Sequence, residues 1–195
     1  MRYNYCMHGL TLILSSIIFV LLAIIVFLCA FIALRVKRDK KIKQAFELSN
    51  RDYLTGLSNK IEFERVVSGV IEHQKHDEIG ALVLVEIECL KSDFTVIALA
   101  NTLISSFRIA DLKSRCDKNV FAVFMRNVFD VDSVAKKVSD LQSAIKSQNI
   151  KSVAGICWCK GPQIENTFVD IYYCASTALL TAKEAGNDSF AIVGK

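Results

Sequence analysis

The stretch Arg51–Phe63, RDYLTGLSNKIEF, decides how the rest of the chain is interpreted. Asn59 is a favoured helix N-cap, because its side chain can accept a backbone N–H from the first helical turn. After Asn59, apolar residues recur on one side of a helix, at Ile61, Phe63, Val66, Val67, Val70 and Ile71. The stretch therefore predicts a capped amphipathic helix near the start of a folded domain.

The segment before this stretch is strongly hydrophobic. Of the 25 residues Leu10–Leu34, only Thr11, Ser15 and Ser16 are not apolar. As a helix they would span about 37 Å, enough to cross a hydrocarbon core of about 30 Å. A cleavable signal peptide would have a shorter apolar run with positive charge before it. We therefore predict a transmembrane helix over residues 9–34. The 170 residues outside Leu10–Leu34, roughly 46% hydrophobic, have the composition of one globular domain.

The charge of the chain is divided unevenly. Residues 1–43 carry seven basic and one acidic residue, whereas the remainder has a net charge of −2. The basic run RVKRDKKIK directly follows the apolar segment, so the positive-inside rule places it in the cytoplasm, next to anionic lipid headgroups. This predicts residues 1–8 outside, a basic juxtamembrane helix over residues 35–50, and a cytoplasmic domain over residues 51–195. A nucleic-acid binder would carry its basic surplus on the folded domain, so nucleic-acid partners are excluded.

The seven cysteines agree with a domain in a reducing compartment. They show no paired metal-ligand spacing, and they are Cys6, Cys29, Cys89, Cys116, Cys157, Cys159 and Cys174. Cys157 and Cys159 flank Trp158 in a strand-like stretch, so they are expected to share one face and to pack in the core.

Strands and helices interleave along the domain. The patterns predict strands over residues 81–87, 113–115, 120–125, 152–159 and 189–193, the second and third being joined by a tight polar turn. Helices are predicted over residues 95–108 and 131–148, and a last helix is capped by Asn166 and stopped at Gly186. This order predicts an α+β fold, with helices covering a sheet that contains antiparallel strands.

Four pieces of the chain resemble GGDEF domains, the diguanylate cyclase family. The opening Asp52-Tyr-Leu-Thr-Gly-Leu-Ser-Asn59 is similar to D-x-L-T-G-L-x-N, and ALVLVEIECLK is similar to the strand L-L-x-I-D-I-D-x-F-K. Arg108–Arg115 is similar to the R-x-x-D-x-x-x-R run before the signature, and the helix that ends at Gly186 is similar to A-D-x-A-L-Y-x-A-K-x-x-G-R-N. The resemblance covers residues 47 to 195, and it implies a palm-like sheet flanked by helices in a bacterial inner-membrane protein.

The signature itself departs from the family. The G-G-[DE]-E-F turn corresponds here to Asp117, Lys118, Asn119, Val120 and Phe121. The resemblance places Asn119 at a metal-carboxylate position, and the other metal aspartate corresponds to Glu86. Both glycines that let backbone approach the phosphates are replaced. Because Mg²⁺ chemistry on a triphosphate needs paired carboxylates, the sequence predicts no metal, no catalytic residues and no cyclase activity.

Other nucleotide contacts are also reduced. The family's guanine-binding segment after the strand is missing, because Lys91-Ser-Asp-Phe-Thr95 runs directly into a helix, and the arginine of the closing G-R-N is Asn187. Lys91 and Lys183 remain at positions that lie near the triphosphate in the family. Two lysines are equally what a solvated surface carries, so they identify no site alone.

One feature that could bind a ligand is retained. In the family, R-x-x-D five residues before the signature binds cyclic di-GMP, and Arg108 and Asp111 stand at that spacing before Asp117. Arginine offers a planar fork to phosphate or to a guanine edge, and a carboxylate can accept guanine N–H groups. The structural alternative is an ion pair between residues three apart at a helix end. A further basic residue used by such sites would be Lys136 or Lys137.

Three functions remain open at this point. The first is a membrane-anchored, catalytically inactive receptor or regulator that needs no cofactor and binds cyclic di-GMP through Arg108 and Asp111. The second is a nucleotide-independent interaction subunit of an envelope complex for secretion or polysaccharide export, and the third is an active diguanylate cyclase. A protein partner is expected, and a homodimer is plausible, although no GxxxG motif or clear heptad run specifies one.

Overall fold

The computed structural model describes residues 27–29, 31–32, 34–35, 37, 50–75, 77–88, 92–160 and 167–194. The chain divides into two compact units, Met1–Ser49 and Asn50–Lys195. In the first unit the described residues, all between 27 and 37, are helical. Across the described residues no helix has the length and apolar character needed to cross a membrane. Most of the predicted crossing, and nearly all of the juxtamembrane helix, lie outside the described residues.

The second unit is built around one mixed six-stranded sheet in the order β1-β3-β4-β2-β5-β6. The strands are β1 (Ser58–Asn59), β2 (Ile79–Ile87), β3 (Leu112–Arg115), β4 (Val120–Val128), β5 (Ser152–Lys160) and β6 (Phe190–Gly194). Strand β2 is central and pairs antiparallel with β4 and β5, whereas β1 pairs parallel with β3, and β6 parallel with β5. The predicted α+β class and the order of its elements are confirmed, with the two-residue β1 in addition.

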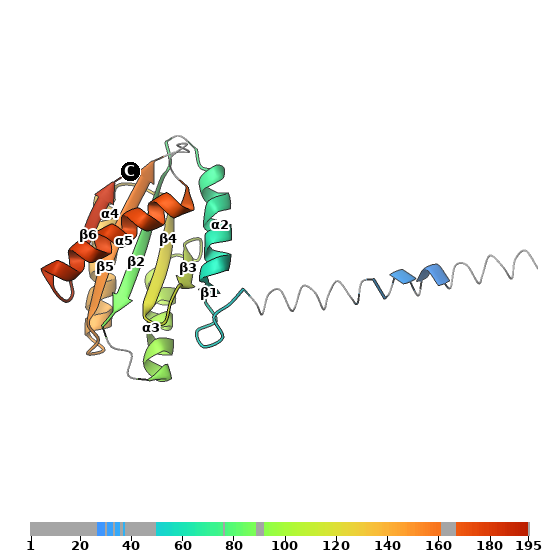
Figure 1. Ribbon diagram of the computed structural model, residues 1–195, viewed down its shortest axis with the longest axis horizontal. Helices are drawn as coiled ribbons and strands as arrows, with labels where there is room; N and C mark the ends of the chain where they lie inside the picture. The colour runs from blue at the N-terminus through green and yellow to red at the C-terminus, as the bar shows by residue number, and fades with distance from the viewer. Residues whose placement is uncertain are drawn as a thin grey trace, which may run out of the picture. The chain divides into compact units, whose positions relative to one another are not determined.

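Helices cover both faces of the sheet. Helices α2 (Lys60–Glu72) and α5 (Phe168–Ala185) pack on one face, and α3 (Asp93–Ser106) and α4 (Val131–Lys146) pack on the other (Figure 1). Alternate residues of β2 point into these two cores, because successive side chains of a strand face opposite sides. The predicted common face of Cys157 and Cys159 is confirmed, since both are fully buried under α5.

Helix starts follow their capping residues, with one correction. Asn59 caps α2 as predicted, and its side chain accepts the N–H of Glu62 at 3.0 Å. The prediction that Asn166 caps α5 was wrong, because Thr167 is the N-cap and forms a reciprocal capping box with Asp170. A hydroxyl three residues before a carboxylate satisfies two backbone N–H groups at once, which a lone Asn at the preceding position cannot do.

Gly155 determines how closely α5 lies on the sheet. A Cβ atom at this position would stand 2.2 Å from the carbonyl oxygen of Ala175 and 2.3 Å from the backbone nitrogen of Leu179. These are backbone atoms and cannot turn aside, so only glycine allows this approach. Helix α5 thus rests backbone to backbone on β5.

Candidate functional site

The opening loop is anchored by Asp52. Its carboxylate accepts the backbone N–H of Thr55 at 2.9 Å and the Thr55 hydroxyl at 2.7 Å. Gly56 allows the loop to turn back with a φ of +68°, and its N–H donates to the Asp52 carbonyl at 2.9 Å. The sequence motif that opens the domain is therefore a compact turn held by one aspartate.

Arg115 joins this turn to the signature hairpin. Its guanidinium reaches both carboxylate oxygens of Asp52 at 3.3 Å and donates to the Lys118 carbonyl at 2.9 Å. Burial raises the pKa of Asp52, but the hydrogen bonds from Thr55 and the charge of Arg115 outweigh that effect, so its pKa lies below the usual 3.8. Asp52 of the opening loop and Arg115 before the signature turn thus form one bridge between distant parts of the chain.

The side chains of the signature turn form hydrogen bonds with backbone groups of the turn and of β2. Asp117 accepts the N–H of Lys118 at 2.7 Å, and the Asn119 amide donates to the Ile87 carbonyl at 3.2 Å. Phe121 is buried in the core, and Val120 stands opposite Glu86 in the β2–β4 ladder. Asn119 is therefore occupied in tying the turn to β2.

Two of the remaining family positions pair with each other. The Lys183 ammonium on α5 lies 2.7 Å from the Glu86 carboxylate on β2. Lys91, the third such position, lies outside the described residues. Within the described part of the chain no cluster of three or more His, Cys, Asp or Glu side chains could hold a metal ion. At this end of the sheet Glu86, which corresponds to a metal aspartate of the family, is neutralised by a lysine.

The other retained motif lines a pocket at the opposite end of β4. The pocket has a volume of about 110 Å³, and its lining residues come from the loop after α3, from β4 and from α4. They are Arg108, Asp111, Met125, Arg126, Val128, Ser133 and Lys137. The structure thus brings Arg108 and Asp111 together, and of the two candidate lysines Lys137 lines the pocket and Lys136 does not.

Asp111 does not form the ion pair that the residue spacing allows. Its carboxylate accepts the backbone N–H of Arg108 at 3.0 Å and that of Arg126 at 3.4 Å. The Lys113 ammonium donates to the carbonyls of Arg108 and Asp111, and burial lowers the pKa of Lys113 despite the nearby charge of Asp111. The side chains of Asp111 and Lys113 therefore hold this loop by hydrogen bonds to backbone groups.

Arg126 is a pocket residue that sequence reasoning missed. In the β3–β4 hairpin Arg115 pairs with Phe121 and Leu112 with Phe124, so the ladder continued outward places residues 110 and 111 opposite residues 126 and 125. The side chain of Arg126 is exposed. Extending the predicted hairpin by three residues would have identified it.

A second pocket lies beside the C-terminal end of α2. It has a volume of about 140 Å³, and Gln74, Gly80 and Phe124 are among the residues that line it. The buried Gln74 amide donates to the Glu78 carbonyl at 2.8 Å, while its oxygen has no hydrogen-bond partner in the described structure. Arg126 lines this pocket as well, and therefore lies between the two hollows.

Comparisons with solved structures show the same fold. The coiled coil and GGDEF domain of DgcB from Caulobacter crescentus, in complex with c-di-GMP, is 16% identical with a TM-score of 0.71 over 85% of this chain and 96% of that one. Diguanylate cyclase SiaD from Pseudomonas aeruginosa, in complex with its activator SiaC, is 18% identical with a TM-score of 0.66 over 99% and 80%. Vibrio cholerae LapD, an S helix-GGDEF-EAL protein bound to c-di-GMP, is 17% identical with a TM-score of 0.68 over 81% and 40%.

Sequence comparison identifies the family. No curated protein matches the chain. The model of the family described as diguanylate cyclase, GGDEF domain, matches residues 49–189, which is well over half of the chain. This match agrees with the mixed sheet flanked by helices and with the solved structures above. The chain therefore belongs to the GGDEF-domain family.

Proposed function

We propose that this protein is a membrane-anchored, catalytically inactive GGDEF domain that acts as a receptor for cyclic di-GMP through Arg108 and Asp111. The observation that carries the proposal is the pocket in which Arg108, Arg126 and Lys137 converge around Asp111. Within the described residues none of these three cationic side chains has a hydrogen-bond or ion-pair partner. Charges without partners beside a hollow suit an anionic ligand.

Calorimetry on the full-length chain, purified in detergent, tests the receptor. We expect cyclic di-GMP to bind, and Arg108→Ala to weaken the binding about tenfold or more, because the guanidinium fork is removed. Lys136→Ala is the matched control, since Lys136 is an exposed cation on α4 that does not line the pocket. Absence of binding at high micromolar ligand, or equal losses in both variants, would remove the receptor from consideration.

Catalytic inactivity is supported by the Glu86–Lys183 ion pair and by the engagement of Asn119 with Ile87. A metal ion would have to compete with an ammonium group at 2.7 Å, and there is no second carboxylate at the Asn119 position to help it. We expect no cyclic di-GMP from GTP and Mg²⁺ under conditions in which an active diguanylate cyclase gives product. Product formation that Glu86→Ala abolishes would contradict this part of the proposal.

Membrane anchoring is supported by the 22 apolar residues within Leu10–Leu34 and by the basic run that follows them. In this arrangement the chain crosses the bacterial inner membrane once, with Cys6 outside. An impermeant maleimide applied to intact spheroplasts should label the chain, and Cys6→Ser should abolish that labelling. Labelling that persists in Cys6→Ser would place the domain cysteines outside and reverse the topology.

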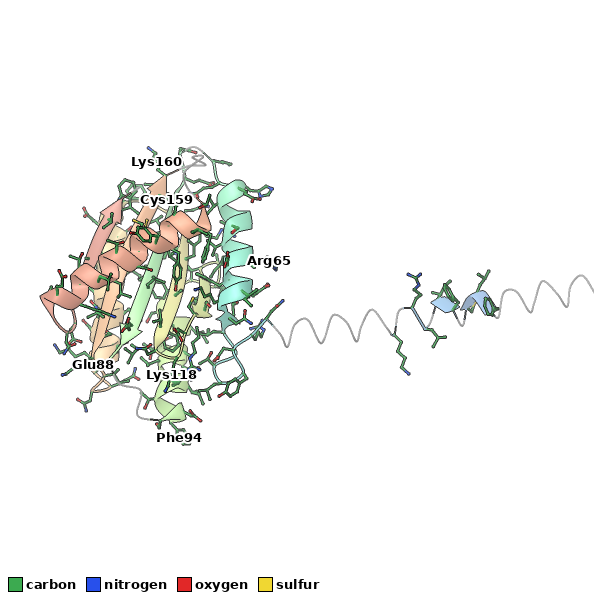
Figure 2. All side chains as sticks on the ribbon, viewed as in Figure 1. Arg65, Glu88, Phe94, Lys118, Cys159 and Lys160 are labelled. Atoms are coloured by element: carbon green, nitrogen blue, oxygen red, sulfur yellow. The ribbon has the colours of Figure 1, made fainter. Side chains whose placement is uncertain are left out.

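A second candidate function is a protein-interaction subunit, and α3 favours it. From Phe94 to Phe107 this helix region contains no charged residue. Its outer side nevertheless exposes an apolar row, Phe94 at 84%, Ile97 at 38% and Ile104 at 50%, and Figure 2 shows Phe94 at the N-terminal end of α3. An apolar row of this kind is typical of a protein contact. SiaD, a structural relative, is found in complex with its activator SiaC, which gives a precedent in the fold.

Co-purification distinguishes the second function from the first. A partner retained from membranes by the full-length chain, lost in Ile104→Glu and kept in Arg108→Ala, would favour the interaction subunit. In α3 the matched control is Ser105→Glu, at an exposed neighbour on the same turn that carries no apolar side chain. A partner lost equally in both variants would not be bound through the apolar row.

A further inference from the structure

The hollow beside the C-terminal end of α2 is separate from the proposed receptor pocket, and the two share only Arg126. Its lining residues come from α2, from the loop that follows α2, and from the paired strands β2 and β4. They are Gly69, Val70, His73, Gln74, Glu78, Gly80, Phe124, Arg126 and Asn127. Polar side chains from separate segments of the chain therefore meet at this hollow.

A β-bulge supplies the cationic side chain. The register of β2 and β4 shifts here, so that Gly80 stands opposite both Arg126 and Asn127. Asn127 accommodates the extra residue with a left-handed backbone at a φ of +48°, which Asn tolerates. Arg126 follows Phe124 by two residues along β4, and side chains two apart lie on the same face of a sheet. The exposed Arg126 side chain therefore belongs to the face that α2 covers.

The hollow is also lined by a carboxylate. Glu78 ends the loop between α2 and β2, and its side chain accepts the backbone N–H of Lys75 at 3.1 Å. Among the ion pairs formed by the described residues, none includes Glu78 or Arg126. One cation and one anion thus line the same small space without neutralising each other or being neutralised by a neighbour.

Uncharged acceptors lie beside the carboxylate. The His73 ring nitrogen Nδ1 donates to the Gly69 carbonyl at 2.8 Å, which leaves Nε2 of the neutral ring as an acceptor. The Gln74 side chain is only 7% exposed, and its amide donates to the Glu78 carbonyl at 2.8 Å. Its oxygen is buried without a partner in the described structure. This side of the hollow therefore lacks hydrogen-bond donors, and an ammonium group would bring three.

The volume of the hollow suits a very small ligand. It is about 140 Å³, close to an engineered cavity of about 150 Å³ that holds benzene, a molecule of about six non-hydrogen atoms. Alanine has that size, and Val70 and Phe124 offer apolar surface for its methyl group. Gly80 helps to keep the space open, because a Cβ atom there would stand 2.9 Å from the tip of the Phe124 ring.

We infer that this hollow binds a small free α-amino acid, whose carboxylate pairs with Arg126 and whose ammonium group pairs with Glu78. A zwitterion gives each of the two protein charges a partner, whereas a ligand with a single charge leaves one of them unpaired. This binding goes beyond the proposed receptor function, because it needs no nucleotide and uses neither Arg108 nor Asp111.

Calorimetry on the full-length chain in detergent, with three probes of equal size, tests the inference. L-Alanine has both charges, L-alaninamide has only the ammonium group, and L-lactate has only the carboxylate. We expect saturable binding of L-alanine, and binding of the other two that is weaker by about tenfold or more, because each loses one charged hydrogen-bonding group. Equal binding of either analogue, or no binding of L-alanine up to about 20 mM, would overturn the inference.

Variants locate the binding within the chain. Glu78→Gln and Arg126→Ala should each weaken L-alanine about tenfold, since each removes one charged partner. Glu72→Gln is the matched control, because Glu72 is an exposed carboxylate at the end of α2 that does not line the hollow. An L-alanine affinity that is the same in Glu78→Gln as in Glu72→Gln would place the binding elsewhere and overturn the inference.

Cyclic di-GMP as a second ligand separates this inference from the receptor proposal. Glu78→Gln should leave the dissociation constant of cyclic di-GMP unchanged, because Glu78 does not line the receptor pocket. If L-alanine binds through Glu78 and cyclic di-GMP does not bind, the amino-acid site stands and the receptor falls. If cyclic di-GMP binds and L-alanine does not, the receptor stands and this inference falls.

Discussion

The two ends of strand β4 differ in whether their charged side chains are paired. Near Val120, Glu86 and Lys183 neutralise each other at 2.7 Å, and Asn119 is bonded to the backbone of β2. Near Val128, three cationic side chains line a hollow, while the carboxylate of Asp111, which lines it too, accepts two backbone N–H groups. In a GGDEF domain the first end is where catalysis is expected, yet the second end has the unpaired charge. In this chain the paired charges therefore lie at the end with the signature turn, and the cations without partners lie at the other end.

The largest effect is expected at the pocket end, from Asp111→Ala. This change leaves the backbone N–H groups of Arg108 and Arg126 without their acceptor in a partly buried position. Each unsatisfied group costs about 1–3 kcal/mol, so we expect a loss of about 3 kcal/mol in the free energy of unfolding. Urea denaturation of Asp111→Ala beside Arg108→Ala, which removes only an exposed side chain, measures the difference. Equal free energies of unfolding in the two variants would show that the Asp111 hydrogen bonds do not stabilise the loop after α3.

Arg115→Ala should have the next largest effect, at the catalytic-type end. It removes the bridge to Asp52 and the hydrogen bond to Lys118, while the Arg115 Nε–H, which is buried without a partner, is lost with it. We expect a loss of about 2 kcal/mol, since breaking a largely buried ion pair costs about 3–5 kcal/mol and the removed Nε–H offsets part of that. Arg65→Ala, at an exposed pair with Glu62, should change stability by less than about 0.5 kcal/mol. A loss in Arg115→Ala as small as that in Arg65→Ala would mean that the signature hairpin is stable without the bridge to Asp52.

The same bridge predicts a dependence on acid. The pKa of folded Asp52 lies below the unfolded value of 3.8, so the ionised form stabilises the fold at pH values above 3.8. That contribution is lost as the pH falls through the lower folded pKa. The stability gap between the natural chain and Asp52→Asn should therefore be constant from pH 5 to pH 7 and should narrow below pH 3.8. A gap that widens on acidification would contradict the assigned direction.

The smallest effect compares one substitution at the two ends. Lys183→Ala leaves Glu86 without its partner, and a partly exposed pair contributes about 0.2–1 kcal/mol. Lys137→Ala removes a cation that lies among other cations, so it should cost nothing measurable or raise stability slightly. The melting temperatures of the two variants should differ in low salt and converge in high salt, because salt screens both charge effects. Identical losses at low salt would erase the difference between the two ends.

Local pattern was enough to predict most of the fold. The Asn59 cap, the apolar spacing of α2 and the alternation around Trp158 each depend on neighbours within a few residues, and the structure agrees with them. The start of α5 was misplaced by one residue, because Asn and Thr are both good caps and only the partner Asp170 decides between them.

The candidate sites depended on contacts that the sequence does not display. Glu86 and Lys183 are 97 positions apart, and their pairing follows from α5 packing across β2 and β5. The role of Asp111 follows from a hydrogen bond to the backbone of Arg126, in which the identity of residue 126 has no part. The motif therefore located the pocket, but the hydrogen bonds and ion pairs of each side chain could be identified only from the structure.

The backbone contact at Gly155 extends its influence beyond the core. Because α5 rests directly on β5 there, no side chain separates the backbone of the helix from that of the strand. Lys183 lies about one turn beyond Leu179 on the same helix, so its distance from Glu86 depends on how closely α5 packs on the sheet. A methyl group added at position 155 would push α5 away from β5. It would thereby separate Lys183 from Glu86 without contacting either residue.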